Sequence, residues 1–287
     1  MTVIDAHQHA WDPRVVEYDW LVGDDPLNRP ILWDELAPHL ARNGITGTVM
    51  VQSADNDADT EFMVETAKAH PEVLAIVGYV PLHDPAEAAR GLDQYRAEPR
   101  IVGYRNLIHT RADVDWLVRP AFDEGLGLLE AAGVTFDIVG VLPEHLRHVP
   151  TLSERHPDLK MVIDHLNKPP IGADDRDPWW SLIARAAENP NVYAKVSGLY
   201  AAVGDPASWT PDMIRPFFDR ALEVFGPERL MYGGDWPISM LAGDYDRVWD
   251  GLQMVFADLG AADRERILAG TAIEFYGIGR ARIGQTG

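Results

Sequence analysis

Two histidines separated by one residue, His7 and His9, lie near the start of the chain in the segment Val3–Ala10. The apolar, β-prone residues before them predict a buried strand, and alternate side chains of a strand point to the same face. We therefore expect Asp5, His7 and His9 on one face. Two imidazoles at this spacing can hold one metal ion or one substrate oxygen, although two histidines bonded only within a strand end have the same pattern.

Other groups that bind cations or exchange protons follow later apolar segments. His165 comes directly after such a segment, and Asp235 lies in the sequence Gly-Gly-Asp-Trp-Pro. Taken singly, His165 is also consistent with a loop histidine and Asp235 with a turn aspartate. Their common role depends on whether the fold brings them together with His7 and His9.

The remaining chain alternates between segments typical of strands and of helices. Runs of β-branched and apolar residues predict strands, while amphipathic segments bounded by Asn, Asp, Pro or Gly predict helices. After the first strand, we expect strands at Thr46–Ser53, Val73–Pro81, Ile101–Ile108, Val134–Val139, Leu159–Asp164, Val192–Ser197 and Arg229–Gly233. We expect helices at Leu32–Asn43, Asp57–His70, Pro85–Ala97, Val114–Ala132, Pro143–His156, Trp179–Glu188, Pro211–Phe225, Asp244–Asp258 and Ala262–Ala269.

This order predicts an α/β fold, a TIM-like (β/α)8 barrel. The length of 287 residues is close to the roughly 250 residues typical of such barrels, and the near-continuous apolar strands suit a parallel sheet buried on both faces. A doubly wound open sheet is the main alternative, but no glycine-rich phosphate-binding sequence follows any expected strand. No internal linker stands out, so we expect one domain over residues 1–287.

Catalytic groups of a (β/α)8 barrel lie at the C-terminal ends of its strands. His7, His9, His165 and Asp235 all fall at this rim, so we interpret them as one site that binds a cation or activates a water. The same rim is predicted to carry Arg105, Asn106, Asp137, Lys195 and Ser197.

A long polar and aromatic segment, Trp11–Leu32, follows the first strand. Loops of this length are uncommon and often functional. The segment is either a flap over the site, which would bring Trp20 to it, or a surface excursion. Trp236 and Trp20 are candidates for the pocket wall, with an ordinary core position as the alternative.

Composition excludes several classes of function. The chain has 45 acidic and 25 basic residues and a formal charge of -20, which argues against nucleic acid or an anionic membrane as a partner. Cysteine is absent, so disulfides and thiolate chemistry are excluded and any metal must use His and carboxylate ligands. Neither a leader-like N-terminus nor an apolar run of about 18 residues is present, which predicts a cytoplasmic protein; homo-oligomerisation is left open.

Several motifs together resemble a known family. The segments IDAHQHAWDP, DHLNKPP, YAKVSGL, MYGGDWP and GTAIEFYGI are similar to those of the amidohydrolase superfamily, in its branch of sugar-lactone hydrolases, the L-fuconolactonase and L-rhamnonolactonase group. The resemblance implies a distorted barrel of the amidohydrolase type that hydrolyses a small carbonyl substrate. It also implies that His7, His9 and His165 are the family's strand-one and strand-six histidines and that Asp235 is the general base.

The chain departs from the two-metal members of this family. It has Arg105 where they carry a bridging Lys or Glu, and Asp137 where they carry a histidine. The resemblance therefore implies one divalent ion, zinc first, held by His7, His9, His165 and Asp235, or catalysis without a metal.

The predicted function is a lactonase that opens an aldonolactone, a small-molecule lactone, to its hydroxy acid. Asp235 takes the proton of water, with His165 as a second catalytic residue. The expected substrate contacts are Arg105, Asn106, His109, Lys168, Trp236 and Trp20, with Lys195 a weaker candidate; Arg105 alternatively pairs with a core acid such as Asp137. A decarboxylase of the same wider family and a sugar-acid binding protein are the competing functions.

Overall fold

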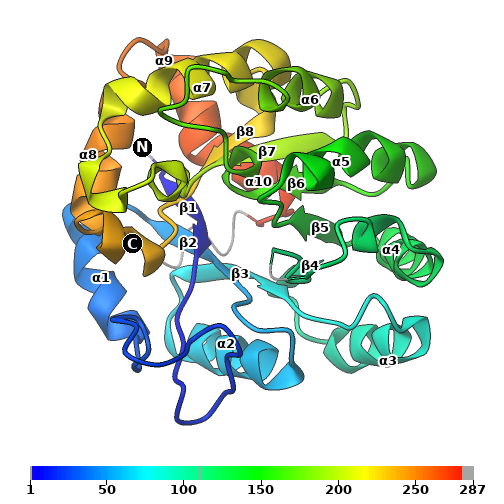
Figure 1. Cartoon of the computed structure of the whole chain (residues 1–287). Helices are drawn as coiled ribbons and strands as arrows, with labels where there is room; N and C mark the ends of the chain where they lie inside the picture. The colour runs from blue at the N-terminus through cyan, green and yellow to red at the C-terminus, as the bar shows by residue number, and fades with distance from the viewer. Residues whose placement is uncertain (1, 110, 280–287) are drawn as a thin grey trace.

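Eight parallel strands surround the centre of the molecule, and helices cover them on the outside (Figure 1). The structure is a computed structural model, and it describes residues 2–109 and 111–279. Each strand pairs with the next one in the sequence, which is the order of a TIM-like (β/α)8 barrel, so the predicted fold is confirmed. The strands are β1 (Ile4–Gln8), β2 (Gly47–Val51), β3 (Val73–Gly78), β4 (Ile101–Arg105), β5 (Thr135–Ile138), β6 (Met161–Ile163), β7 (Val192–Val196) and β8 (Leu230–Tyr232).

The helices follow the predicted order, although the helix expected from Val114 begins only at Pro120, after a 3-10 turn at Trp116–Val118. Asn56, Asp84 and Thr210 cap three of them, because each side chain accepts a bond from a backbone N–H of the first turn. They are α1 (Trp33–Arg42), α2 (Asp57–Ala69), α3 (Pro85–Tyr95), α4 (Pro120–Ala132), α5 (Pro143–Arg155), α6 (Trp179–Ala186), α7 (Pro211–Phe225), α8 (Tyr245–Val255), α9 (Ala261–Glu265) and α10 (Thr271–Phe275).

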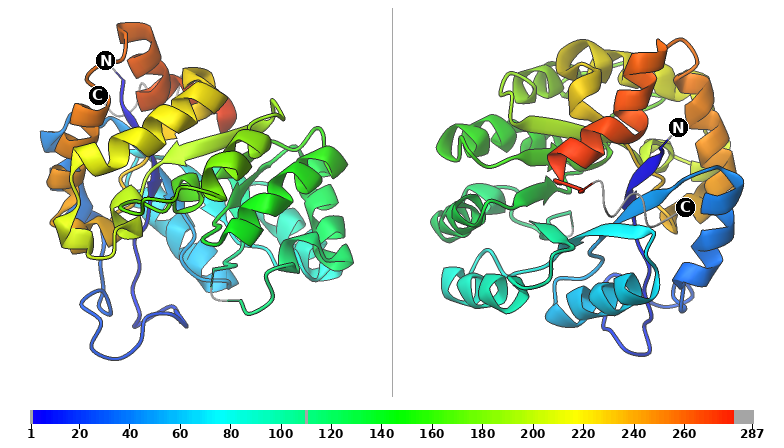
Figure 2. Two further views of the ribbon diagram at one scale, coloured as in Figure 1. Left: turned by 45° about the horizontal axis from the view of Figure 1, so that its top comes forward. Right: turned by 180° about the vertical axis from the view of Figure 1, so that it is seen from behind.

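The last helical region extends beyond the predicted helix Ala262–Ala269. After α9, a π-helical turn at Arg266–Gly270 leads directly into α10. Seen from behind in Figure 2, α10 lies against the barrel in red. Ala272 and Phe275 belong to the same buried apolar cluster as Ile4 and Ala6 of β1. The C-terminal helix thus packs on the apolar part of the barrel and leaves the C-terminal ends of the strands free for a site.

Backbone bonds join the end of β1 to the segment that follows β8, beside the predicted site. The N–H of Asp235 donates to the carbonyl of His7 at 2.8 Å, and the N–H of His9 donates to the carbonyl of Trp236 at 2.7 Å. The two strand ends that carry the candidate residues are therefore held directly against each other.

The prediction that Asp5 shares a face with His7 and His9 is wrong. The pairing of β1 with β2 shifts register between Asp5 and Gln8, which marks a bulge. One extra residue reverses the alternation of side chains. The Asp5 carboxylate accepts a bond from the Tyr245 hydroxyl of α8 at 2.8 Å, whereas His7 and His9 meet inside the barrel with 3.2 Å between their Nε2 atoms.

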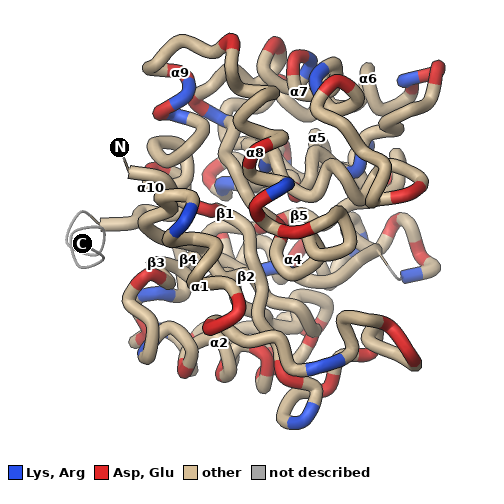
Figure 3. The backbone as a smooth tube through the Cα atoms, turned by 90° about the vertical axis from the view of Figure 1, so that its left-hand side faces the viewer, with Lys and Arg blue, Asp and Glu red and all other residues tan. Residues whose placement is uncertain are grey.

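Positions with charged side chains occur along much of the chain. In the view of Figure 3, acidic and basic positions are interspersed along the helices and loops. Across residues 2–109 and 111–279, no helix combines the length and apolar character that a membrane span requires.

Candidate active site

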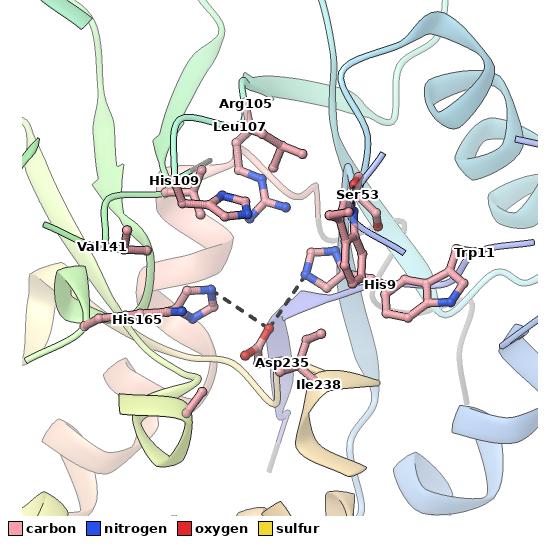
Figure 4. A pocket seen from close by; sticks show the side chains of 14 residues that line it. His9, Trp11, Ser53, Arg105, Leu107, His109, Val141, His165, Asp235 and Ile238 are labelled. Atoms are coloured by element: carbon pink, nitrogen blue, oxygen red, sulfur yellow. Dashed lines mark hydrogen bonds and ion pairs between the residues drawn. The ribbon is translucent and has the colours of Figure 1, made fainter. Parts of the chain in front are cut away.

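A cavity of about 180 Å³ opens at the C-terminal ends of the strands (Figure 4). This volume limits a ligand to a small molecule. The cavity is lined by His9, Trp11, Trp20, Ser53, Arg105, Leu107, His109, Val139, Val141, His165, Lys168, Ala201, Asp235 and Ile238. Half of these side chains are apolar and half are polar or charged, so the cavity combines an apolar wall with groups that can orient a ligand.

Three imidazoles converge on one carboxylate oxygen at this cavity. Asp235 Oδ1 lies 3.7 Å from His9 Nε2, 3.8 Å from His7 Nε2 and 3.9 Å from His165 Nε2. Figure 4 shows His9 and His165 on either side of Asp235. The structure therefore brings together the four residues that the sequence placed at one rim.

The other ring nitrogens are held by neighbouring strands. His9 Nδ1 lies 2.7 Å from the carbonyl oxygen of Val51, which can only accept, so Nδ1 carries a proton and Nε2 is the nitrogen that faces the cavity. His165 Nδ1 lies 2.9 Å from Ser197 Oγ. These bonds orient the rings before any ligand arrives.

Asp235 is held in a defined orientation. The Tyr200 hydroxyl donates to its Oδ2 at 3.3 Å, which leaves Oδ1 for the histidines. Burial alone would raise the pKa of Asp235, but the positive potential of His165 and the contacts with His9 and His7 outweigh burial and hold the pKa well below its usual value. The carboxylate is therefore ionised at neutral pH.

His165 begins a turn of unusual backbone conformation. The four residues His165, Leu166, Asn167 and Lys168 all have φ between 46° and 57°. L-residues avoid this left-handed region, so surrounding contacts must hold the turn. Trp179 supplies one of them, because its Nε1 donates to the carbonyl of Leu166 at 2.7 Å. The turn directs both His165 and Lys168 to the cavity.

A buried ionic cluster lies behind His7. Arg105 Nη1 donates to Asp164 Oδ2 at 3.0 Å, and Lys195 Nζ donates to Asp137 Oδ2 at 2.6 Å. Arg105 thus pairs with a core acid, as in the predicted alternative, but the acid is Asp164 and not Asp137. Lys195 contacts both acids. Burial lowers the pKa of His7 well below its ordinary value, so its ring is neutral at pH 7.

The predicted substrate contacts divide into two groups. Arg105, His109, Lys168 and Trp20 line the cavity. Asn106 and Trp236 are absent from the lining: Asn106 Nδ2 donates to the carbonyl of Val80 at 3.0 Å, and Trp236 is buried beside a separate surface pocket. Asn106 directly follows Arg105 at the end of β4, where neighbouring side chains point in opposite directions.

The segment Trp11–Leu32 contributes Trp11 and Trp20 to the cavity, so the geometry supports the flap over the surface excursion. Trp20 Nε1 donates to the carbonyl of Ser53 at 2.7 Å, and the Tyr18 hydroxyl donates to Asp59 Oδ1 at 3.0 Å. Two bonds to the end of β2 and the start of α2 thus fasten the flap beside the site.

Sequence reasoning missed several residues of the site. Ser53 and Val139 are the last residues of predicted strands, so the strand-end rule could have included them. Asp164 likewise ends the predicted strand Leu159–Asp164, whereas Tyr200 gave no signal in the sequence, because its role depends on the partners that the fold brings to it. The other missed lining residues are Trp11, Leu107, Val141, Ala201 and Ile238.

The four converging groups fit a divalent ion. Ligands about 2.0–2.1 Å from a tetrahedral zinc ion lie roughly 3.3 Å apart. The Nε2 atoms of His7 and His9 are 3.2 Å apart, and Asp235 Oδ1 lies within 3.9 Å of each imidazole. His7, His9 and Asp235 form one candidate ligand group, and His165 approaches the same carboxylate.

Comparison with known proteins finds amidohydrolases and lactonases that are similar to this chain. A family model described as amidohydrolase matches residues 4–278. L-fucono-1,5-lactonases from Burkholderia ambifaria and Burkholderia multivorans are 34% and 32% identical to the chain, each over 96% of both proteins. A crystal structure of an amidohydrolase from Burkholderia multivorans with bound zinc superposes with a TM-score of 0.90 at 29% identity, covering 97% of this chain and all of the other.

Proposed function

We propose that this chain, which belongs to the amidohydrolase family, hydrolyses the ester bond of a sugar-acid lactone and releases the hydroxy acid. The L-fucono-1,5-lactonases, which match nearly the whole chain, support this reaction class. They do not favour the alternatives, a decarboxylase or a sugar-acid binding protein.

The main support for this proposal is the position of Asp235. Its carboxylate lines a small cavity, is ionised at neutral pH and lies between three imidazoles, where a water can approach both a base and hydrogen-bonding partners. Hydrolysis of a lactone requires these two elements, a group that takes the proton of water and donors for the oxyanion that develops on the carbonyl.

In the reaction, Asp235 takes a proton from water as the water oxygen bonds to the lactone carbonyl carbon. The carbonyl oxygen becomes an oxyanion, and its electrons then re-form the double bond while the bond to the ring oxygen breaks. The proton held by Asp235 passes to the ring oxygen, which leaves as a hydroxyl. Asp235 is thereby returned to its ionised form.

The opposite wall of the cavity supplies positive charge. Arg105 and His109 lie across from Asp235 in Figure 4, and Lys168 lines the same cavity. We assign to Arg105 and Lys168 the attraction of the oxyanion and of the carboxylate product, and to Trp20 a flat apolar face for the substrate. The net charge of -20 does not attract an anion, so these local cations must do so.

His7, His9, His165 and Asp235 would hold the divalent ion. When bound, such an ion polarises the lactone carbonyl and lowers the pKa of water.

The proposal is tested by following proton release from a panel of aldonolactones, with chelated and zinc-supplied enzyme side by side. The panel contains L-fuconolactone, L-rhamnonolactone and D-galactonolactone. We expect rapid acid release from at least one lactone. Carbon dioxide from an aromatic acid, with no acid release from any lactone, would instead support the decarboxylase.

A further inference from the structure

Asp5 is a completely buried acid behind the site, and the reaction described above does not use it. An acid inside a protein needs hydrogen-bond donors in place of water. Three groups donate to Asp5: the backbone N–H groups of His7 and Gly234 bind Oδ1 at 3.0 and 2.9 Å, and the Tyr245 hydroxyl binds Oδ2 at 2.8 Å. One oxygen, Oδ1, therefore joins β1 to the segment that follows β8.

The bond from Gly234 lies next to the residue that carries the proposed chemistry. Gly234 directly precedes Asp235, whose own N–H donates to the carbonyl of His7 at 2.8 Å. Two successive N–H groups of this segment are thus held by β1, the first by the Asp5 carboxylate and the second by the His7 carbonyl. Because the Asp235 carboxylate is only a few covalent bonds from these N–H groups, they determine where it lies relative to the His7 ring.

The two glycines before Asp235 allow this close approach. A Cβ on Gly234 would lie 2.7 Å from Asp5 Oδ2 and closer still to the Tyr245 ring, and a Cβ on Gly233 would lie 2.7 Å from the His7 Cβ. Real Cβ atoms do not come so close to other atoms, so a side chain at either position would push the segment away from β1. The pair Gly233-Gly234 is therefore needed for the contact with β1.

Tyr245 fixes the orientation of the Asp5 carboxylate from outside the barrel. It lies on α8 and is completely buried, and its hydroxyl accepts a bond from the Tyr232 hydroxyl at 3.3 Å. Since the proton between the two tyrosines comes from Tyr232, the Tyr245 proton is free to point to Asp5 Oδ2. Tyr245 thus binds Oδ2, which leaves Oδ1 for the two backbone N–H groups.

We propose that Asp5 is a positioning residue that fixes the Asp235 carboxylate against the His7 imidazole, because one Asp5 oxygen binds the backbone N–H groups of both His7 and Gly234. Asp5 is not among the residues that line the cavity, so it acts only through the two segments that it joins. A misplacement of about 1 Å can lower a catalytic rate about 100-fold. The inference deepens the proposed function, on which its kinetic test rests.

Asp5→Ser tests the link by shortening the side chain. The serine oxygen can still accept from the N–H two residues further on, that of His7, but it is one atom too short for Gly234. We expect kcat to fall about 100-fold while KM stays within about threefold of wild type, because the side chains that contact the substrate are unchanged. Asp5→Thr has the same short oxygen on a β-branched side chain that suits a strand, so it should show the same loss and replaces Asp5→Ser if serine prevents folding.

Two further variants separate positioning from stability. Tyr245→Phe removes the bond to Oδ2 but keeps both bonds to Oδ1, so it should lower the melting temperature by roughly 5 °C and keep the wild-type kcat. Asp5→Asn keeps an oxygen for the two N–H groups and turns its amide towards Tyr245, so it should restore kcat to within about threefold of wild type.

A purely structural role for Asp5 predicts that kcat follows the melting temperature across all these variants, and this result would overturn the proposal. It would also be overturned by a folded Asp5→Ser or Asp5→Thr enzyme with nearly wild-type kcat. A loss of kcat in Asp5→Asn as large as that in Asp5→Ser would show that the shared oxygen is not the feature that matters.

Zinc affinity provides a readout that does not require turnover. His7 and Asp235 belong to one candidate ligand group with His9, so their displacement in Asp5→Ser should weaken zinc binding by at least about tenfold, measured by competition with a chelating dye. Tyr245→Phe should keep the wild-type affinity, and equal affinities in Asp5→Ser and wild type would contradict the proposal. Absence of lactone hydrolysis by wild type would contradict the proposed function, whereas the zinc comparison would still decide the role of Asp5.

Discussion

Asp235 Oδ1 lies 3.9 Å from His165 Nε2, and both residues have φ angles in the left-handed region, 52° and 55°. Such a conformation costs an L-residue roughly 1–2 kcal/mol, so it persists only where the surroundings enforce it. Two neighbouring functional side chains are thus presented by backbone that the fold must hold in place.

Gly198 helps to keep Asp235 and His165 in these positions. Its φ is +58°, and a Cβ at this position would lie 2.6 Å from both Asp235 Oδ2 and His165 Nδ1. We expect Gly198→Ala to displace these groups and to lower kcat by about 100-fold, the usual effect of a small misplacement of catalytic groups. Gly133→Ala is the matched control, because Gly133 has a φ of +67° but nothing within 4 Å of the added Cβ. Gly133→Ala should be less stable than wild type but should keep the wild-type kcat. A similar kcat in Gly198→Ala and Gly133→Ala would show that Gly198 does not help to position Asp235 and His165.

The flap is expected to control substrate affinity. Tyr18→Phe removes the bond to Asp59, whose other oxygen accepts the backbone N–H of Ser53 at 2.6 Å. A lost bond to a charged group is worth roughly 1.5–3 kcal/mol, so KM should rise about tenfold with kcat nearly unchanged. Tyr95→Phe serves as the control, because the Tyr95 hydroxyl has no hydrogen-bond partner in the described part of the chain. A fall in kcat at constant KM would show that Tyr18 does not act through binding.

Metal binding should depend on the histidines at the cavity. His165→Ala is expected to weaken zinc binding by at least about tenfold, measured by competition with a chelating dye. His39 belongs to a separate group with Asp244 and Asp246, and His39→Ala should leave the tight site unchanged. Equal affinities in His165→Ala and wild type would remove His165 from the ligand set.

His109 should make stability depend on pH. Burial, assisted by the positive charges of Arg105 and Lys168, lowers its pKa from 6.5 to about 4. Between these values the unfolded chain binds more protons at this residue than the folded chain, so its contribution to stability is lost as the pH falls from 6.5 to 4. Glutamine does not titrate, so His109→Gln lacks this pH-dependent loss. As the pH falls from 6.5 to 4, the melting temperature of wild type should therefore decrease more than that of His109→Gln. Parallel curves would show that His109 titrates normally in the fold.

The alternation of elements and the strand-end rule were sufficient to predict the barrel and to group His7, His9, His165 and Asp235. Both depend on local patterns, namely apolar runs and the residues that follow them. Asp5 was placed on the wrong face because a bulge is a property of two paired strands and has no clear signature in one of them.

The sequence also did not show which side chains pair with one another. Arg105 could pair with either buried acid, and only the packing of β4 to β7 selects Asp164, while Lys195 contacts both Asp164 and Asp137. The anchor of the flap joins Tyr18 to Asp59 across 41 residues of sequence, which no local pattern reveals. Contacts of this kind follow from the fold as a whole.

The central claim is that Asp235 takes the proton of water in lactone hydrolysis. The most direct measurement is proton release from the best lactone substrate by wild type and by Asp235→Asn, with melting temperatures recorded for both. The amide has nearly the same shape but cannot accept this proton, so kcat should fall by at least about 1000-fold while the variant stays folded. A folded Asp235→Asn enzyme that retains more than about a tenth of wild-type kcat would contradict the account.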